Sequence, residues 1–534
     1  VVLVLPRKML GTVSLVLFAF VGWVFFFLVA FKSFSSRKVN VEKLKSFPLE
    51  EPSEVQQIRE DFEKIAGQQP PNASYEESSK VVSSLISGGD FLRVEHLLRE
   101  NAQRLFWIHR LCGTVPEGGL GVRLTVQCNL FGGTVANLGS SEQISWLEGV
   151  FKRGELGCFL LTEQNAGVLS GLIVNTTATY NGKNFILHSP EPTAASKKCW
   201  ISQGLCAKWG VVIARLILES GEDKGPHAFV IDMKTNGVVC EDMPRKTDFN
   251  SLDNACVEFH NVELPRSALL SGISYVDEDG NYKLVKEDQP FSFVTVAQRL
   301  LSGRICIAGC ALSQLKRVIS EVETYGNTRM IPTGRDQTTP LSQMPVMRDL
   351  LARYRALTKV FEQYSILLEN EFMTAPTLSA KLVDKIACAK IESIAFTIDA
   401  MHALKEGVGS LSLFEHGPFG SKNDILYVFR FAEGDSAILQ QKLARDAVKR
   451  LQSPIGMLKE ILNVPVALLK NHNGKGLYRA QLSLSLVSLA LKLNVPKNKM
   501  MGVWLESHAV IKDIAHKRAL LTILDSVAPS MHST

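Results

Sequence analysis

Two carboxylates stand at the start of a predicted helix in the stretch "RFAEGDSAIL", residues 430–439. Glu433 precedes a glycine, and Asp435 opens the apolar run "SAILQQKLARDAV". Asp435 and Ser436 have the chemistry of helix N-caps, and Glu433 could simply favour the positive end of the helix dipole. A desolvated carboxylate at the same place could instead act as a general base. The local sequence leaves both interpretations of Glu433 open.

Two further stretches carry side chains that could contact a cofactor. In "LGCFLLTEQNAGVLSGL", residues 156–172, a hydroxyl and a carboxylate follow an apolar run, which a plain strand-to-loop turn also explains. In "KKCWISQGLCAKWGVVIARL", residues 197–216, Trp200 and Ser202 are separated by one residue. Alternate residues of a strand share a face, so an indole can cover a planar cofactor while the hydroxyl bonds a ring nitrogen. As structure alone, Trp200 is an ordinary half-buried aromatic residue.

Several common kinds of site find no support in the sequence. There is no G-x-G-x-x-G after a strand, no Walker loop, no H-E-x-x-H helix, no C-x-x-C pair and no Cys/His cluster at zinc spacing, so no metal site is predicted. The ten cysteines suit a reducing compartment, and Cys306 with Cys310 reads as small apolar filling on one helix face. The net charge of +6, without a basic block, argues against nucleic acid as a partner.

The order of patterns along the chain predicts an α+β fold and not a doubly wound sheet. Helical periodicity marks an N-terminal α-helical domain over 39–157, and short β-type runs mark a middle β-domain over 158–275. Long helical patterns then predict a C-terminal helical bundle over 276–455 and a shortened helical extension over 456–534.

An uncharged apolar run at residues 9–31 is long enough to cross a bilayer, which predicts a membrane anchor within residues 1–38. More basic residues follow the run than precede it, so the later domains would face the cytosol. Because the chain begins with Val, a truncated or mistranslated 5′ end is the alternative explanation of this run.

Five motifs in order resemble those of the acyl-CoA oxidase family, within the acyl-CoA dehydrogenase superfamily, and most of all its oxidase-like members. They lie between about residues 80 and 450: "LLTEQNAG" resembles the T-E loop, "TTATYNGKNFILHSP" the oxidase β-domain, "CWISQG" the W-I-[ST]-N-G motif, "LDNACVEFHNVELPRSALL" the strand that closes the β-domain, and "RFAEGDSAILQQ" the F-E-G-E-N motif. The resemblance implies an N-terminal helical domain, a middle β-domain and a C-terminal four-helix bundle. It also implies FAD between the last two and a homodimer.

The same resemblance assigns the cofactor-binding residues. Thr162 matches the flavin-contacting threonine of the T-E loop, and Trp200 and Ser202 match the residues that pack on the flavin and bond its N5 side. Arg329, in "YGNTRM", matches an arginine that reaches the FAD of a neighbouring subunit.

The resemblance also implies a reaction. Glu433 matches the base that removes the α-proton of a fatty acyl-CoA while the β-hydride passes to the flavin, which gives a trans-2-enoyl-CoA. Arg304 matches the arginine that opens the preceding bundle helix, and the resemblance assigns it to substrate binding. Molecular oxygen would then be reduced to hydrogen peroxide, in fatty-acid β-oxidation.

Departures from the family pattern keep other functions open. The glycine-rich G-G-H-G-Y of the oxidases is here only "GVGSL", residues 407–411, and the chain after residue 450 is shorter than an oxidase's C-terminal domain. A catalytically weak scaffold that binds acyl-CoA or a protein partner is therefore one alternative, and a dehydrogenase that passes electrons to a flavoprotein is another. The family implies a peroxisomal location, although the sequence ends "MHST" without an S-K-L-type tripeptide.

Overall fold

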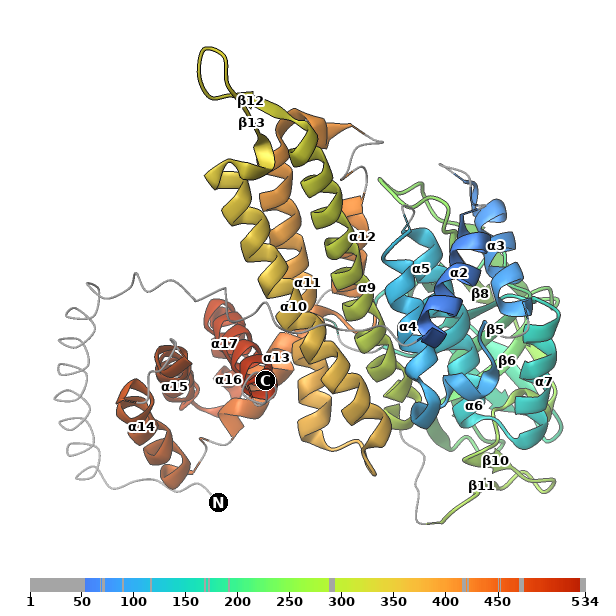
Figure 1. Cartoon of the computed structure of the whole chain (residues 1–534). Helices are drawn as coiled ribbons and strands as arrows, with labels where there is room; N and C mark the ends of the chain where they lie inside the picture. Colours follow the sequence, from blue (N-terminus) through green and yellow to red (C-terminus); the bar gives the residue numbers. More distant parts are fainter. Residues whose placement is uncertain are drawn as a thin grey trace, which may run out of the picture. The chain divides into compact units, whose positions relative to one another are not determined.

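The computed structural model describes residues 53–528, apart from short gaps at 68, 70–72, 89–90, 116–117, 168–169, 171–172, 191–192, 288–292, 415–418, 420–421, 450, 452 and 470–474. Helices come first, then strands, then helices again, so the predicted α+β order is confirmed (Figure 1). In this part of the chain no helix is both long and apolar enough to cross a membrane. The predicted anchor at 9–31 lies outside the described residues and stays a prediction.

The N-terminal helices begin where the sequence provides caps. Ser74 and Ser140 each accept a hydrogen bond from the third residue of the helix that follows, whose side chain bonds back to the cap. Three segments then follow one another without a break, the middle one π-helical. The elements are α2 (Ser53–Ala66), α3 (Tyr75–Ser87), η3 (Val94–Leu97), η4 (Arg99–Asn101), α4 (Gln103–Cys112), α5 (Gly119–Leu124), η5 (Thr125–Gly132), α6 (Gly133–Leu138) and α7 (Ser141–Lys152).

The middle region contains two main sheets. A six-stranded sheet has the order β1-β5-β2-β3-β9, with β6 also paired to β5, and a three-stranded sheet has the order β4-β8-β7. The centre of the larger sheet is β5, a mostly buried apolar run. The strands are β1 (Gly157–Leu160), β2 (Thr177–Tyr180), β3 (Phe185–His188), β4 (Lys198–Ser202), β5 (Trp209–Ile217), β6 (Asp223–Asp232), β7 (Val238–Asp242), β8 (Asn254–Phe259) and β9 (Val262–Leu264), with the short helices α8 (Thr193–Ser196) and η6 (Arg266–Ala268).

Strands continue past the predicted boundary at residue 275. β10 (Ser274–Val276) and β11 (Tyr282–Leu284) form a two-stranded hairpin around the turn "DEDGN". Each strand has three residues of mixed polarity, which is too short for periodicity to reveal in the sequence.

Three long helices run side by side in the C-terminal region (Figure 1). They are α9 (Phe293–Thr328), α10 (Pro345–Thr374) and α11 (Ala380–Val408), and a hairpin of β12 (Met330–Pro332) and β13 (Thr338–Pro340) with η7 (Leu341–Gln343) joins the first two. After η8 (Gly409–Leu413), two shorter helices complete the bundle, α12 (Lys422–Phe431) and α13 (Ser436–Lys449).

The last four helices form an extension that packs against the bundle. They are α14 (Pro454–Leu469), α15 (Lys475–Lys492), α16 (Lys497–Glu506) and α17 (His508–Val527). Asp384 of α11 accepts hydrogen bonds from Lys442 of α13 at 2.8 Å and from Arg518 of α17 at 2.6 Å. This shared carboxylate ties the extension to the bundle helices.

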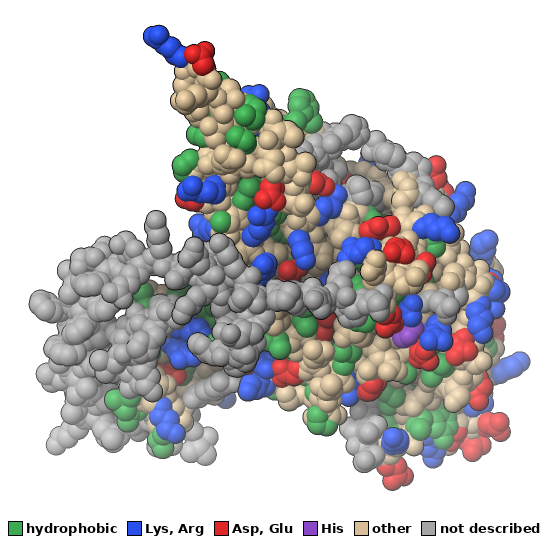
Figure 2. Space-filling model, viewed as in Figure 1, with side chains coloured by type: hydrophobic (Ala, Val, Ile, Leu, Met, Phe, Trp, Pro, Cys, Tyr) green, Lys and Arg blue, Asp and Glu red, His purple; other side chains and the backbone are tan. Residues whose placement is uncertain are grey.

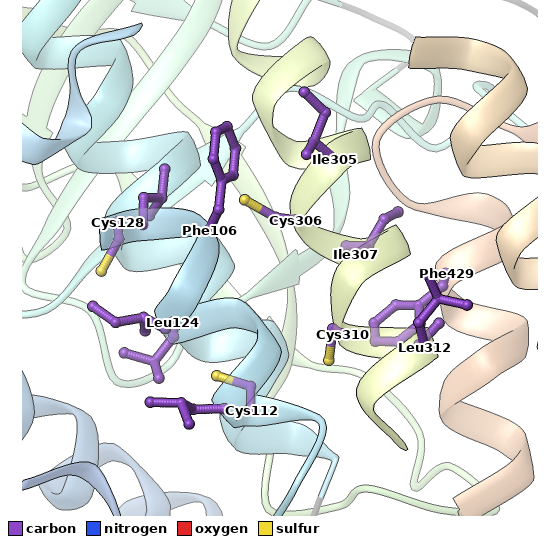
Figure 3. Packing of buried hydrophobic residues seen from close by; sticks show 14 of the residues in the cluster. Phe106, Cys112, Leu124, Cys128, Ile305, Cys306, Ile307, Cys310, Leu312 and Phe429 are labelled. Carbon is purple, nitrogen blue, oxygen red and sulfur yellow. The ribbon is translucent and has the colours of Figure 1, made fainter. Parts of the chain in front are cut away.

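The core joins the N-terminal helices to α9 (Figure 3). Cys306 points from α9 toward Phe106, and the helices that carry Cys112 and Cys128 face this part of α9. The exposed fractions of Cys306 and Cys310 are 1% and 6%, and burial raises the pKa of both, that of Cys306 well above its ordinary value and that of Cys310 to about 12, so both remain thiols. The prediction that these cysteines act as apolar filling is confirmed.

Charged side chains of both signs are interspersed over the visible face of the β-domain and N-terminal helices (Figure 2). The described residues of this face therefore show no patch of one charge that would mark a functional site.

Candidate active site

Glu433 lies in the tight link between α12 and α13, and its backbone is strained. Its φ is 56° and that of Gly434 is 93°, so two successive residues adopt left-handed conformations. A non-glycine residue pays of order 1–3 kcal/mol for such a conformation and keeps it only where its surroundings impose it. Here Arg304 of α9 donates from Nε to the Glu433 carbonyl at 2.8 Å, and Asp435 accepts from the amide of Ala437 at 2.6 Å. The predicted capping role of Asp435 is confirmed.

The Glu433 side chain is turned inward onto α9. It is only 7% exposed, and a Cβ added to Gly303 would lie 2.2–2.5 Å from its carboxyl carbon and oxygens. Glycine is thus the residue that leaves room for the carboxyl group at this point of α9. A solvated charge at a helix start, the simpler interpretation of Glu433, does not fit this position.

The protonation chemistry of Glu433 follows from its burial. Loss of solvent raises the pKa of Glu433 to about 8, and the cations Arg304 and Lys390 oppose that rise. Its Oε2 atom is buried and has no hydrogen-bond partner among the described residues. A carboxylate with a pKa near neutrality and one unused acceptor is suited to take a proton from another molecule.

Lys390 of α11 clamps the link that carries Glu433, and sequence reasoning missed it. Its Nζ donates to the carbonyls of Arg430 at 2.8 Å and Gly434 at 2.9 Å, and to Ser436 Oγ at 2.9 Å. Three acceptors match the three donors of an ammonium group. Burial, with Arg304 nearby, lowers the pKa of Lys390 to about 7. The only sequence signal was a lysine within the apolar run "IACAKIESIAF", which does not reveal what it contacts.

The structure brings Thr162, Trp200 and Ser202 together in the β-domain. The Thr162 carbonyl accepts from the amide of Cys199 at 2.9 Å, so the T-E loop lies beside β4. The Trp200 side chain is 61% exposed and Ser202, two residues on, accepts at Oγ from Asn254 Nδ2 at 3.1 Å.

The expected reason for this arrangement was wrong in one respect. Trp200 is not in a regular strand: its φ is 60°, and the pairing of β4 with β8 shifts between Lys198 and Ile201. A β-bulge therefore positions the indole, and not the regular alternation that was predicted to place Trp200 and Ser202 on one face.

A buried ion pair holds the T-E loop, and it too was missed. Glu163 and Lys198 are both fully buried with 2.9 Å between Oε1 and Nζ, and Glu163 also accepts from the amides of Asn175 and Thr176. Burial lowers the pKa of Lys198 to about 8 while Glu163 opposes the shift. The carboxylate was visible in the motif, but its inward orientation was not.

The loop between β7 and β8 joins this group to the helix that leads to Glu433. Trp200 donates its amide to Met243 Sδ at 3.2 Å. Four residues on, Thr247 donates to Asp424 of α12 at 2.5 Å. One short loop segment, which spans at most about 14 Å, thus contacts the Trp200 backbone at one end and the N-terminal turn of α12 at the other, and the far end of α12 leads to Glu433.

Arg329 lies apart from the other predicted site residues. It is exposed and follows the last residue of α9, next to the β12–β13 hairpin (Figure 1). From Arg304 to Thr328 the helix rises about 36 Å, at about 1.5 Å per residue. Arg329 therefore cannot share a site with Glu433 in the same chain.

These residues fit a planar, partly polar cofactor. An exposed indole offers a flat apolar surface, and the hydroxyls of Thr162 and Ser202 on adjacent segments can bond ring nitrogens or oxygens. The unpartnered Oε2 of Glu433 supplies an acceptor for a substrate proton. In the described part of the chain no three His, Cys, Asp or Glu side chains are grouped so that they could hold a metal ion.

Comparison with known proteins gives a consistent result. Residues 158–262 match the family model of the acyl-CoA dehydrogenase middle domain. Acyl-coenzyme A oxidase 2, peroxisomal, of Arabidopsis thaliana is 28% identical over 377 residues, which are 66% of this chain and 53% of that protein. The acyl-coenzyme A oxidase-like protein of Mus musculus is 25% identical over 344 residues, 61% of this chain and 54% of that protein. The chain spans about half the length of these curated relatives.

Solved structures resemble the whole fold. Acyl-CoA oxidase 3 of Yarrowia lipolytica has a TM-score of 0.73 at 18% identity, covering 92% of this chain and 77% of that one. Acyl-CoA oxidase-2 of Caenorhabditis elegans, solved bound with FAD, ascaroside-CoA and ATP, has a TM-score of 0.70 at 20% identity, covering 89% of this chain and 76% of that one. The resemblance predicted from the five motifs is confirmed.

Proposed function

We propose that this chain, whose residues 158–262 match an acyl-CoA dehydrogenase middle domain, is an FAD-dependent acyl-CoA oxidase. The reaction would convert a fatty acyl-CoA to a trans-2-enoyl-CoA and reduce oxygen to hydrogen peroxide. The observation that carries the proposal is Glu433, a buried carboxylate with a raised pKa and an unused acceptor atom. Removal of the α-proton of a thioester requires a base with these properties.

In this reaction, the residues around Glu433 would each have a separate role. Glu433 Oε2 takes the α-proton, and the Arg304 and Lys390 hydrogen bonds hold the strained link so that the carboxyl group keeps its position. The bound FAD would supply a two-electron acceptor for the β-hydride and then a donor to oxygen. Gly303 leaves space for the Glu433 carboxyl group, which a side chain at position 303 would displace.

Thr162, Trp200 and Ser202 would hold the FAD, with the indole covering the ring system and the hydroxyls bonding its polar edge. Arg329 would contribute to the FAD site of a second copy in a homodimer, because its exposed position at the far end of α9 leaves it free to reach a neighbour. Relatives in Arabidopsis thaliana and Homo sapiens are named peroxisomal, and we extend that location to this chain.

A catalytically weak scaffold remains the second candidate. It is favoured by "GVGSL", residues 407–411, which spans the end of α11 and the start of η8 and stands in place of the glycine-rich oxidase motif. The mouse relative is likewise named only oxidase-like.

The decisive experiment is anaerobic stopped-flow reduction of the purified protein's flavin by a saturated acyl-CoA. The proposal expects a flavin absorbance in the blue that bleaches with substrate, more slowly by roughly 10² to 10⁴ in Glu433→Gln but at near the wild-type rate in Asp435→Asn. Bleaching followed by rapid return of colour in oxygen separates an oxidase from a dehydrogenase. Bound flavin that substrate never bleaches would support the scaffold, and undiminished bleaching in Glu433→Gln would remove Glu433 from the mechanism.

A further inference from the structure

Two cysteines on neighbouring strands face each other beside Trp200. The Sγ atoms of Cys199, in β4, and Cys256, in β8, are 2.7 Å apart. A disulfide bond is about 2.05 Å long, so the sulfur atoms need approach by only about 0.7 Å to bond.

The pair exists because of the β-bulge. Lys198 pairs with Val257 and Ile201 pairs with Ala255, so Cys199 and Trp200 together stand opposite the single residue Cys256. The extra residue is Trp200, with its left-handed backbone and its exposed indole. One local irregularity therefore both directs the indole outward and brings the two thiols together.

The two thiols differ in access to solvent. Cys199 is 5% exposed, whereas Cys256 is half-buried, so a small oxidant meets Cys256 first. Burial and the hydrogen bond with Cys256 raise the pKa of Cys199 to about 12, and Lys197 opposes that rise. The Lys197 ammonium is fixed nearby, since it pairs with Glu241 at 2.5 Å and with Glu258 at 3.0 Å, on the two strands that flank and carry Cys256.

We propose that Cys199 and Cys256 are a redox-active pair that closes to a disulfide in the presence of a peroxide and so locks the bulge that carries Trp200. In the first step the Cys256 sulfur attacks one oxygen of hydrogen peroxide, the O–O bond breaks, and a sulfenic acid and one water form. In the second step the Cys199 sulfur attacks the Cys256 sulfur, its proton leaves with the displaced hydroxyl as a second water, and the S–S bond forms. Two thiols have then lost two electrons and two protons, and one peroxide has become two waters.

The site does not depend on the proposed oxidase activity, because added peroxide can replace it. If the chain is an oxidase, its own product would be the oxidant. The disulfide would then fix the segment on which the indole stands, close to the residues proposed to hold FAD.

The test uses the full chain without substrate. The reduced protein is treated with hydrogen peroxide, its remaining thiols are alkylated, and the digest is analysed by mass spectrometry without reduction. We expect a linked peptide pair, two hydrogen atoms lighter than its parts, that contains Cys199 and Cys256, accounts for two of the ten thiols and disappears with dithiothreitol. Full alkylation of both cysteines, at peroxide levels that oxidise other thiols or methionines, would overturn the proposal.

Variants sharpen the result. Cys206→Ser removes a half-buried thiol at the turn after β4 and should leave the linked peptide unchanged, whereas Cys256→Ser should abolish it. Subtracting the tryptophan fluorescence of Trp200→Phe from that of the wild type gives the emission of Trp200. This emission should change when the protein is oxidised and recover when it is reduced. Emission that is the same in both states would refute the link between the disulfide and Trp200. The wild-type mass measurement needs no variant, so it decides the pairing even if Cys256→Ser fails to fold.

Discussion

Replacing Gly303 by alanine tests the position of the Glu433 carboxyl group directly. The added methyl would lie 2.2 Å from the carboxyl carbon, whereas ordinary contacts begin near 3.4 Å. The carboxyl group must therefore move by about 1 Å, and it can do so because it is the end of a flexible side chain. A displacement of about 1 Å at a reacting group costs roughly 10² in rate.

Stability should change little, which separates the two effects. Alanine is favoured over glycine inside a helix by about 0.5–1 kcal/mol, and this offsets part of the strain of moving Glu433. Gly303→Ala should thus unfold in urea near the wild-type midpoint while its flavin is reduced by acyl-CoA roughly 10² more slowly.

Gly309→Ala is the matched control on the same helix. Its added methyl would lie 3.4 Å from Arg110 Cγ, an ordinary contact, so flavin reduction should stay close to wild type while the free energy of unfolding rises by about 0.5–1 kcal/mol. Equal reduction rates in Gly303→Ala and Gly309→Ala would refute the argument that proton abstraction depends on where Glu433 is packed.

Three further predictions concern charge and cofactor contact. Because burial raises the pKa of Glu433 from 4.5 to about 8, the folded protein holds a proton that the unfolded chain releases, so this group's contribution to stability is lost as pH rises from about 4.5 through 8. Urea unfolding at pH 5 and pH 9 should therefore show Glu433→Gln gaining stability relative to wild type at the higher pH, and a pH-independent difference would contradict the raised pKa. Lys390→Met should raise the pH at which flavin reduction is half-maximal, and it should lower the free energy of unfolding by roughly 1–3 kcal/mol for each carbonyl left unpaired. The control Lys385→Met breaks a more exposed ion pair on α11, so it should lower the free energy of unfolding by about 1 kcal/mol or less and leave the pH profile unchanged. Trp200→Ala should lower the FAD content of the purified protein more than Ser202→Ala does while changing the unfolding free energy by about 0.5 kcal/mol or less, because the indole is largely exposed; an undiminished FAD content would place the flavin elsewhere.

Local sequence was sufficient for features that depend on neighbours along the chain. The order of helices and strands follows from periodicity and turn residues, and the cap at Asp435 follows from a carboxylate placed before an apolar run. The local stretch left the role of Glu433 open, and only the resemblance of five motifs in order made it a candidate base. For the elements and the cap, the deciding contacts span only a few residues.

The tertiary structure alone decided whether Glu433 can act chemically. Its pKa depends on solvent being excluded by α9, and its position depends on Gly303, Arg304 and Lys390, which lie between about 40 and 130 residues away in the sequence. The same holds for Trp200, whose bulge arises only when β4 pairs with β8, and whose β-domain neighbour Thr162 comes from another loop. A residue's type and motif specify what it could do, but desolvation, strain and unused hydrogen-bonding capacity are properties of the packed neighbours that no short stretch of sequence contains.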